Sequence, residues 1–153
     1  MIEIKSLYKS FGEVEILKGI STTFEKGKTN LIIGQSGSGK TVLLKCLLGL
    51  LIPNKGEIMY DNMSHTVMNT QEKTNLRREM GMVFQGSALF DSMTVLENVM
   101  FPLQMFTTQN KAEIKERAET VIERVKLKDA NQKLPSEISG GMQKRVAIAR
   151  AIV

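Results

Sequence analysis

The sequence is poor in the features that mark secreted and membrane-spanning proteins. It has one cysteine, Cys46, so no internal disulfide can form and a reducing compartment is the better fit. No run approaches the roughly 20 apolar residues that are needed to cross a bilayer. The first residues also lack a basic region followed by an apolar run, which a secretion signal requires. We therefore expect a protein that is neither secreted nor embedded in a membrane.

The positive charge of the sequence is not gathered in one place. The net charge is +5, from 21 basic and 16 acidic residues. Over the segment Lys111–Lys128, basic and acidic residues alternate, as they do on a solvated helix face. No aromatic platform accompanies the basic residues, although proteins that bind single-stranded nucleic acid use one. We predict that nucleic acid is not a partner.

The length and composition are those of one globular domain. The chain has 153 residues, of which 42% are hydrophobic and 24% charged. A chain of this size buries roughly 70% of the surface that its unfolded form exposes. A hydrophobic core is therefore expected.

The first half of the sequence favours short strands around one helix. Apolar runs and turn residues alternate near the N-terminus, which predicts an antiparallel β region. Thr29–Ile33 predicts a strand that ends at glycine, and the apolar run Val42–Leu51 predicts a helix after a glycine-rich loop. Glu57–Tyr60 predicts a further strand, and the polar segment Asp61–Asn75 predicts a surface excursion.

The second half predicts a buried strand and then helices. The strand is Gly81–Phe84, and a capping box of Thr94 and Glu97 begins a helix that runs to about Phe106. The segment Lys111–Lys126 has apolar residues at helical spacing on one face, namely Ile114, Ala118, Val121, Ile122 and Val125. Ser139 is a natural N-cap for the last helix.

One motif carries specific chemistry. The segment Gly34-Gln35-Ser36-Gly37-Ser38-Gly39-Lys40-Thr41 matches the phosphate-binding pattern G-x-x-x-x-G-K-[ST] between a predicted strand and a predicted helix. The glycines let backbone N–H groups surround phosphate oxygens, and the helix N-terminus adds its positive end. Lys40 neutralises the β and γ charges, and Thr41 offers a hydroxyl to Mg²⁺. We predict that this loop binds ATP with Mg²⁺.

A phosphate-binding loop alone leaves kinases, GTPases, motors and transporters open. The segment Ile138–Ala151, with Ser139-Gly140-Gly141 at its start, resembles the signature motif and following helix of the ABC ATPase family. It departs at Ile138 and Met142, where Leu and Gln are commoner. The resemblance implies that Ser139, Gly140 and Gly141 contact the γ-phosphate of an ATP bound on a second subunit.

Two further residues match the family in order and spacing. Gln85 resembles the glutamine that ligates Mg²⁺ and couples the nucleotide site to the membrane partner, and Phe11 resembles the aromatic that stacks on adenine. The resemblance therefore implies Lys40 and Gln85 as catalytic residues, and Thr41 and Gln85 as metal ligands. Phe11, the loop from Gly34 to Thr41 and the signature residues are the implied nucleotide contacts.

The resemblance also implies the architecture and the partners. We expect an α/β P-loop domain with a β region and P-loop core at 1–85, a helical subdomain at 86–135, and the signature motif with its helix at 136–153. Two such subunits would form a homodimer that drives a transmembrane permease from the cytoplasmic face of the cell membrane. The segment from Phe84 to Leu103 resembles the ATPases of Mla-type systems, which move phospholipids between bacterial membranes. That likeness suggests a lipid cargo.

The family continues into a strand that ends in Asp-Glu, and the 153 residues do not include it. The glutamate normally polarises the attacking water, so we expect this chain to bind ATP far better than it hydrolyses it. We also expect uncovered sheet edges to make the chain self-associate. The alternatives are a soluble ABC-type ATPase that acts on DNA or ribosomes, and a non-hydrolytic nucleotide-binding module.

Overall fold

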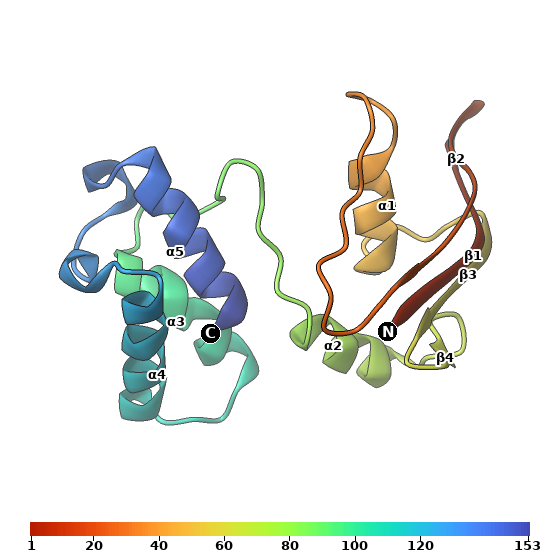
Figure 1. The fold of residues 1–153 in the computed structure, drawn as a ribbon. Coiled ribbons are helices and arrows are strands. Elements are labelled where there is room, and N and C mark those ends of the chain that lie inside the picture. The colour runs from red at the N-terminus through yellow and green to blue at the C-terminus, as the bar shows by residue number, and fades with distance from the viewer. The chain divides into compact units, whose positions relative to one another are not determined.

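The computed structural model describes residues 1–153, which form two compact units. The first unit is Met1–Glu79 and the second is Met80–Val153. Figure 1 shows that strands are confined to the first unit, whereas the second is built from helices and loops. None of the helices has the length and apolar character that a membrane crossing demands.

The first unit contains the predicted antiparallel region as a four-stranded sheet. Its strands are β1 (Ile2–Phe11), β2 (Val14–Phe24), β3 (Lys55–Tyr60) and β4 (Met63–Ser64). The order is β2-β1-β3-β4, and every neighbouring pair is antiparallel. The apolar runs at 14–17 and 20–24 belong to one continuous strand, because β2 pairs with β1 along its whole length.

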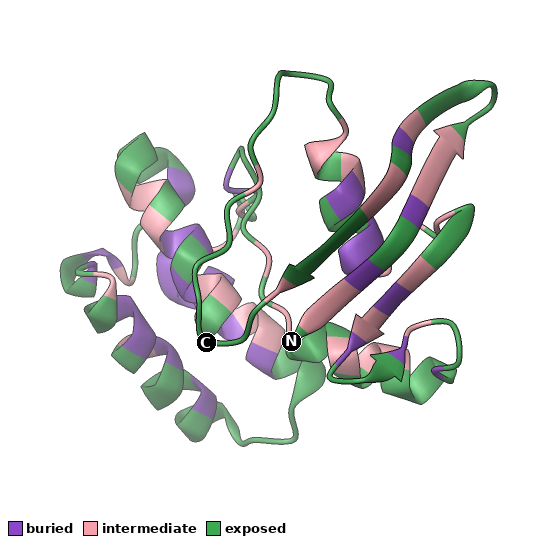
Figure 2. Ribbon diagram, turned by 45° about the vertical axis from the view of Figure 1, so that its right-hand side comes forward, coloured by how far each residue is buried: buried purple, intermediate pink, exposed green.

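The hairpin of β1 and β2 turns tightly at Gly12. Phe11 pairs with Val14, so only two residues connect the strands, and Gly12 has a φ of 57° that few other residues adopt easily. The buried side chains of these strands include Ile4 and Leu17. The helix α1 (Lys40–Leu47) is joined to the sheet by the Tyr60 hydroxyl, which donates to the Leu47 carbonyl. Figure 2 shows buried positions on both α1 and the strands.

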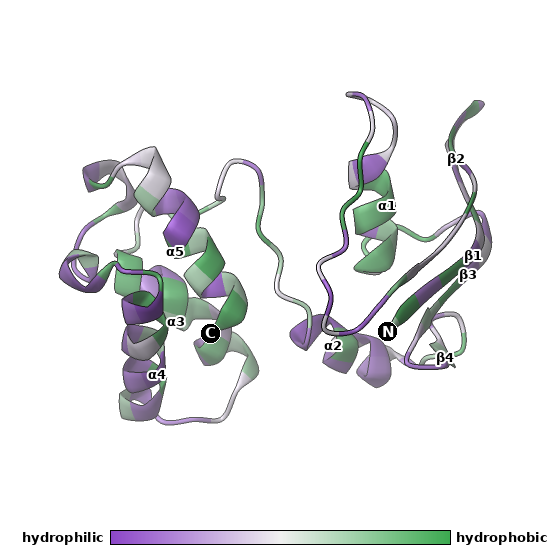
Figure 3. Ribbon diagram, in the orientation of Figure 1, coloured by the Kyte–Doolittle hydropathy of each residue, from purple (hydrophilic) through white to green (hydrophobic).

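The predicted strand Thr29–Ile33 is wrong for this structure. The segment has no regular secondary structure and no strand partner, and Leu31 and Ile33 remain 79% and 84% exposed. A strand needs a neighbour to complete its hydrogen-bond ladder, and no strand of this chain pairs with these residues. Figure 3 shows the hydrophobic stretch of chain that leads up to the loop before α1.

The segment Asp61–Asn75, predicted as a surface excursion, is mostly exposed, but it also contains regular structure that the sequence did not predict. The segment contains β4 and most of the helix α2 (Thr70–Arg78). Asn69 caps α2 by accepting a hydrogen bond from the Glu72 amide at 2.9 Å, and the Glu72 carboxylate accepts one from the Asn69 amide. This helix has no buried residue, so the apolar pattern that would have predicted it is absent.

The second unit contains the three remaining α-helices. They are α3 (Val95–Phe106), α4 (Lys111–Arg124) and α5 (Gly140–Ile152), with 3₁₀ turns at Lys128–Ala130 and Pro135–Glu137. The predicted capping box at Thr94 and the apolar face of α4 are confirmed. One continuous core joins the helices: Val95, Leu96, Val99, Met100, Leu103, Ile114, Ala118, Val121, Ile122, Leu127, Ala130, Ile138, Val146 and Ala149.

The predicted strand Gly81–Phe84 is not present either. The segment is irregular, no strand pairs with it, and Val83 and Phe84 are about half exposed. The loop that follows is held firmly, because the buried amide of Asn98 on α3 accepts from the Phe90 amide and donates to the carbonyls of Phe90, Met93 and Thr94. This loop is thus ordered from within its own unit, and Gly81 before it lies against the end of α5, where an added Cβ atom would meet the Ala151 carbonyl.

Candidate nucleotide-binding site

The glycine-rich loop has the backbone shape that its sequence requires. Gly37 and Gly39 have φ values of 81° and 91°, in the left-handed region that favours glycine. The Ser38 amide donates to the Gln35 carbonyl at 3.2 Å, and the Leu43 amide donates to the Gly39 carbonyl at 2.8 Å. The loop therefore turns on itself and passes directly into the first turn of α1.

Lys40 folds back over this loop. Its ammonium donates to the Gly34 carbonyl at 2.8 Å and to the Gln35 carbonyl at 2.7 Å. The side chain thus closes a ring with the start of the loop and holds the positive charge at that end of it. A phosphate held by the loop would meet this ammonium.

The N-terminus of α1 is open. Each of the helices α2, α3, α4 and α5 is preceded by a residue whose side chain accepts a hydrogen bond from a first-turn amide. These residues are Asn69, Thr94, Asn110 and Ser139 in turn. Before α1 stands Gly39, which has no side chain to accept such a bond. The first amides of a helix have no partner within it, so those of α1 remain available to an anion.

The loop lies beside the hairpin of β1 and β2. A Cβ atom at Gly39 would come within 3.0 Å of Ile16 and 3.1 Å of Leu17 on β2. Ile16 follows the hairpin turn by only a few residues, and Phe11 lies on the other side of that turn. Phe11 is 47% exposed, which leaves it able to contact a ligand. The structure therefore brings two parts of the predicted nucleotide site into one unit.

Sequence reasoning missed Lys9. Its ammonium lies 5.2 Å from the centre of the Phe11 ring and donates to the Ile52 carbonyl at 2.8 Å. Residues two apart on a strand share one face of the sheet, so the spacing of Lys9 and Phe11 was a usable signal.

The signature residues lie in the second unit at the start of α5. The Ser139 hydroxyl accepts from the Met142 amide at 3.3 Å, which confirms the predicted N-cap. Gly140 and Gly141 are exposed, and a Cβ atom at Gly140 would meet nothing within 4 Å. This helix start is accessible to a ligand.

Gln85 is exposed in the loop of the second unit, whereas Lys40 and Thr41 belong to the first. Thr41 is exposed in the first turn of α1, so its hydroxyl is accessible to a cation. A joint role of Thr41 and Gln85 in holding Mg²⁺ stays a prediction.

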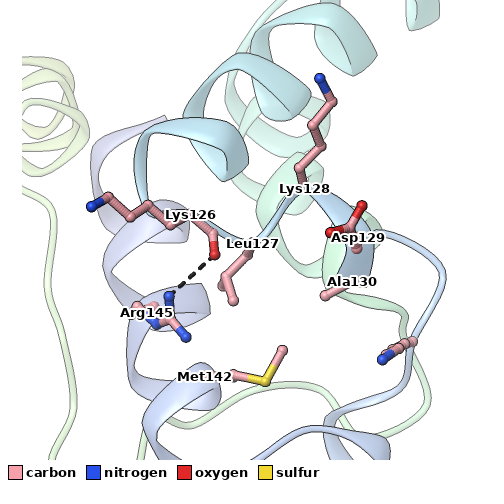
Figure 4. Close-up of a pocket in the computed structure, with 8 residues that line it drawn as sticks. Lys126, Leu127, Lys128, Asp129, Ala130, Met142 and Arg145 are labelled. Carbon is pink, nitrogen blue, oxygen red and sulfur yellow. Dashed lines mark hydrogen bonds between the residues drawn. The ribbon is translucent and has the colours of Figure 1, made fainter.

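A small pocket in the second unit does not fit a nucleotide. It has a volume of about 130 Å³ and lies between the end of α4, the turn at Lys128–Ala130 and α5. Ligand pockets usually measure about 300–1,000 Å³. In Figure 4 the Lys126 and Lys128 side chains point away from Met142, and Arg145 donates to the Lys126 carbonyl at 3.1 Å. The arginine of this pocket, Arg145, thus binds the main chain that follows α4.

Comparisons with known proteins agree with this geometry. A family model described as ABC transporter matches residues 17–153. The L-cystine import ATP-binding protein TcyC of Bacillus subtilis is 46% identical over 99% of this chain and 63% of its own length. The protein TRIGALACTOSYLDIACYLGLYCEROL 3 of Arabidopsis thaliana is 43% identical over 100% of this chain and 44% of its own length. The chain thus spans roughly half to two thirds of these curated relatives.

Solved structures give the same result. The ATP-binding cassette MJ0796, in a dimeric post-hydrolysis state bound to ADP and Pi, is similar with a TM-score of 0.86 and 34% identity, over 99% of this chain and 69% of its own. The protein cbiO1 of Clostridium perfringens, part of the transporter complex cbiONQ, is similar with a TM-score of 0.87 and 28% identity, over 99% and 60%. The fold is that of an ABC ATPase P-loop domain, and the chain belongs to the ABC transporter ATP-binding family.

Proposed function

We propose that this chain is the nucleotide-binding part of an ABC transporter's ATP-binding subunit and that residues 34–41 bind the phosphates of ATP. The observation that carries the proposal is the open N-terminus of α1, which follows a glycine loop closed by Lys40. Backbone amides and one fixed positive charge converge there, which is the chemistry that a triphosphate needs.

Each residue of the cradle has a distinct role in this proposal. The Lys40 ammonium exchanges its carbonyl partners for β- and γ-phosphate oxygens, and the amides of the first turn of α1 bind the remaining oxygens. The exposed Thr41 hydroxyl holds Mg²⁺, which neutralises charge on the phosphates when it is bound. Phe11 stacks on the adenine, a contact worth about 1–3 kcal/mol in base-binding sites generally.

The second unit completes the site of another subunit in our proposal. The exposed glycines at the start of α5 offer amides to a γ-phosphate that is held by a partner's cradle, and Gln85 senses the metal. The MJ0796 cassette supports this arrangement, because that protein is dimeric in a post-hydrolysis state bound to ADP and Pi. Closing of the two subunits would then drive a permease.

We further propose that this chain binds ATP much better than it hydrolyses it. The residues of the cradle, Gly34–Thr41, provide backbone amides, hydroxyls and one ammonium, which serve binding, and a base that polarises the attacking water has to come from outside the cradle. Positioning and charge neutralisation alone stabilise a bound triphosphate but leave the water without a base. Turnover at the rate of intact ABC ATPases would contradict this part of the proposal.

The proposed cargo is a lipid. The segment from Phe84 to Leu103 supports it by its resemblance to the ATPases of Mla-type systems, and so does the relative named for trigalactosyldiacylglycerol. An amino acid is the second candidate, because the cystine-import relative is 46% identical. The ATPase rate of the assembled transporter separates the two: a lipid system is stimulated by phospholipid and not by cystine.

Calorimetric titration of Mg-ATP into this chain tests the nucleotide site. We expect saturable binding that the Lys40→Ala variant weakens by about 10- to 100-fold, the loss expected for hydrogen bonds to a charged group. The matched control is Lys45→Ala, which removes an exposed lysine from the last turn of the same helix. Equal affinity of the Lys40→Ala variant and the unmodified chain would overturn the proposal.

A further inference from the structure

Lys9 is fixed at both ends of its side chain. The backbone belongs to β1, and the ammonium donates to the Ile52 carbonyl at 2.8 Å. The segment that provides this carbonyl is itself tied to β1, because the Asn54 amide donates to the Tyr8 carbonyl and the Asn54 side chain accepts from the Ser10 amide, both at 2.8 Å. The Lys9 ammonium is therefore held in one position by main-chain contacts, whereas the ammonium of a surface lysine normally moves freely.

The fixed ammonium lies over one ring. Its distance to the centre of the Phe11 ring is 5.2 Å, within the range of about 6 Å at which a cation is attracted to the face of an aromatic ring. Phe11 still keeps 47% of its surface exposed beside the hairpin turn. An exposed phenylalanine normally turns freely about its side-chain bonds, and this one is held by a cation on one face.

A cation on one face changes what the other face can bind. It draws π electrons toward itself, so the opposite face repels the π electrons of a stacked base less strongly. It also restricts the ring before the ligand arrives, which reduces the side-chain entropy lost on binding. Both effects strengthen stacking with a base and leave contacts with phosphate unchanged.

We propose that Lys9 is a positioning residue for recognition of the base: it holds Phe11 from one side so that the purine of ATP stacks on the other. The inference rests on the proposed function, because it requires a nucleotide whose phosphates occupy the cradle at Gly34–Thr41. It assigns to Lys9 a role that acts through Phe11 and not through contact with ATP.

The test compares ATP with tripolyphosphate, which has the phosphates but no base. In the chain as it stands, we expect Lys9→Met to weaken Mg-ATP binding by about twofold, and the full worth of an exposed cation–π contact sets an upper limit of about fivefold. Binding of Mg-tripolyphosphate should not change. Lys9→Arg keeps a cation over the ring and should restore ATP binding.

Two further variants separate the contact with the ring from a general effect of charge. Lys5→Met takes one positive charge from the same strand, where Lys5 pairs with Glu3 at 3.3 Å, and should leave the affinity for both ligands unchanged. In the Phe11→Leu background, Lys9→Met should cost nothing more, because the ring through which it acts is gone.

The outcomes separate this inference from the proposed function. If Lys9→Met weakens the binding of both ligands equally, or of neither, while Lys40→Ala weakens the binding of both by about 10- to 100-fold, the inference is overturned and the proposed function stands. If the unmodified chain binds neither ligand, the proposed function falls and the inference falls with it. A loss confined to ATP and rescued by arginine supports both.

Discussion

The two units of the molecule bury their apolar side chains to very different extents. The second has one continuous core that links α3, α4 and α5. The first leaves Leu31, Ile33 and Ile52 each more than three quarters exposed. Exposed stretches are visible on the loop before α1 in Figure 2. The second unit thus buries its apolar side chains in a core shared by its helices, whereas the first unit leaves several large apolar side chains beside its sheet exposed.

The units also differ in how they use polar groups. In the second, the buried Asn98 amide and the Arg150 guanidinium satisfy the main chain of the loop at 87–94. In the first, the loop at 34–39 is held by Lys40 and one backbone bond, and the helix behind it is uncapped. A loop with unpaired donors is less stable, but those donors can bind a ligand. The contrast therefore marks the loop at 87–94 as structural and the loop at 34–39 as a binding loop.

Replacing Asn98 should produce the largest effect. Asn98→Ala leaves the amide and carbonyl of Phe90 without partners inside the second unit, which should cost about 2–4 kcal/mol. Far-UV circular dichroism during urea unfolding follows mainly the second unit, because α3, α4 and α5 (12, 14 and 13 residues) outweigh α1 and α2 (8 and 9 residues). Fluorescence follows the first unit, because Tyr8 and Tyr60 are the only tyrosines and there is no tryptophan.

All the hydrogen bonds of the Asn98 side chain lie within the second unit. Asn98→Ala should therefore shift the dichroism transition and not the fluorescence transition. The exposed Gln104→Ala on the same helix is the control, with an expected change below about 0.5 kcal/mol. Equal shifts of both signals would mean that the two units unfold together.

The next effect concerns the cradle. At Gly39 the φ of 91° strains any other residue, and a Cβ atom would press on Ile16 and Leu17. Gly39→Ala should therefore weaken Mg-ATP binding by about tenfold or more. Gly27→Ala is the control, because Gly27 has a φ of 73° but open space around it. Unchanged binding by Gly39→Ala would show that the loop tolerates a different shape.

Arg150 offers a smaller effect within the second unit. Its guanidinium donates to the carbonyls of Ala88 at 2.8 Å and Ser87 at 3.0 Å, and burial lowers its pKa. Arg150→Met should cost about 1–2 kcal/mol, because the group is partly solvated, and should speed amide exchange at 86–90. Arg145→Met removes bonds to Val125 and Lys126 and should leave that exchange unchanged. The same exchange rates in both variants would contradict this assignment.

The smallest effect is a dependence on pH in the first unit. Burial, with Lys73 and Arg77 nearby, lowers the pKa of His65 below its usual 6.5. The unfolded chain then binds the proton more readily, so the contribution of His65 is complete above pH 6.5 and is lost as the pH falls below it. As the pH falls from about 7.5 to 5.5, the urea midpoint of the fluorescence transition should fall more in the unmodified chain than in His65→Gln. Parallel curves would exclude this role for His65.

Local patterns predicted the helices of the second unit well. The Thr94 capping box, the apolar face of α4 and the Ser139 N-cap all depend on residues within a few positions of one another. Such interactions form wherever the helix forms, so no distant partner is required. The same holds for the glycine loop before Lys40, whose backbone shape follows from its own glycines.

The wrong predictions share a different cause. The strands expected at Thr29–Ile33 and Gly81–Phe84 need neighbours, and apolar sequence alone does not provide them. The helix α2 was missed for the opposite reason, since its capping box at Asn69 is a local signal but no apolar stripe follows it. The spacing of Lys9 and Phe11 was a local signal that went unused, whereas the Ile52 carbonyl that binds the Lys9 ammonium is distant in the sequence.

The most direct measurement of the nucleotide site is hydrogen exchange of the dilute chain with and without Mg-ATP. We expect slower exchange in the glycine loop and the first turn of α1, where amides would bind phosphate, and little change across α3 and α4. No protection at residues 34–43, or protection spread evenly over both units, would contradict the assignment of the nucleotide site to the first unit.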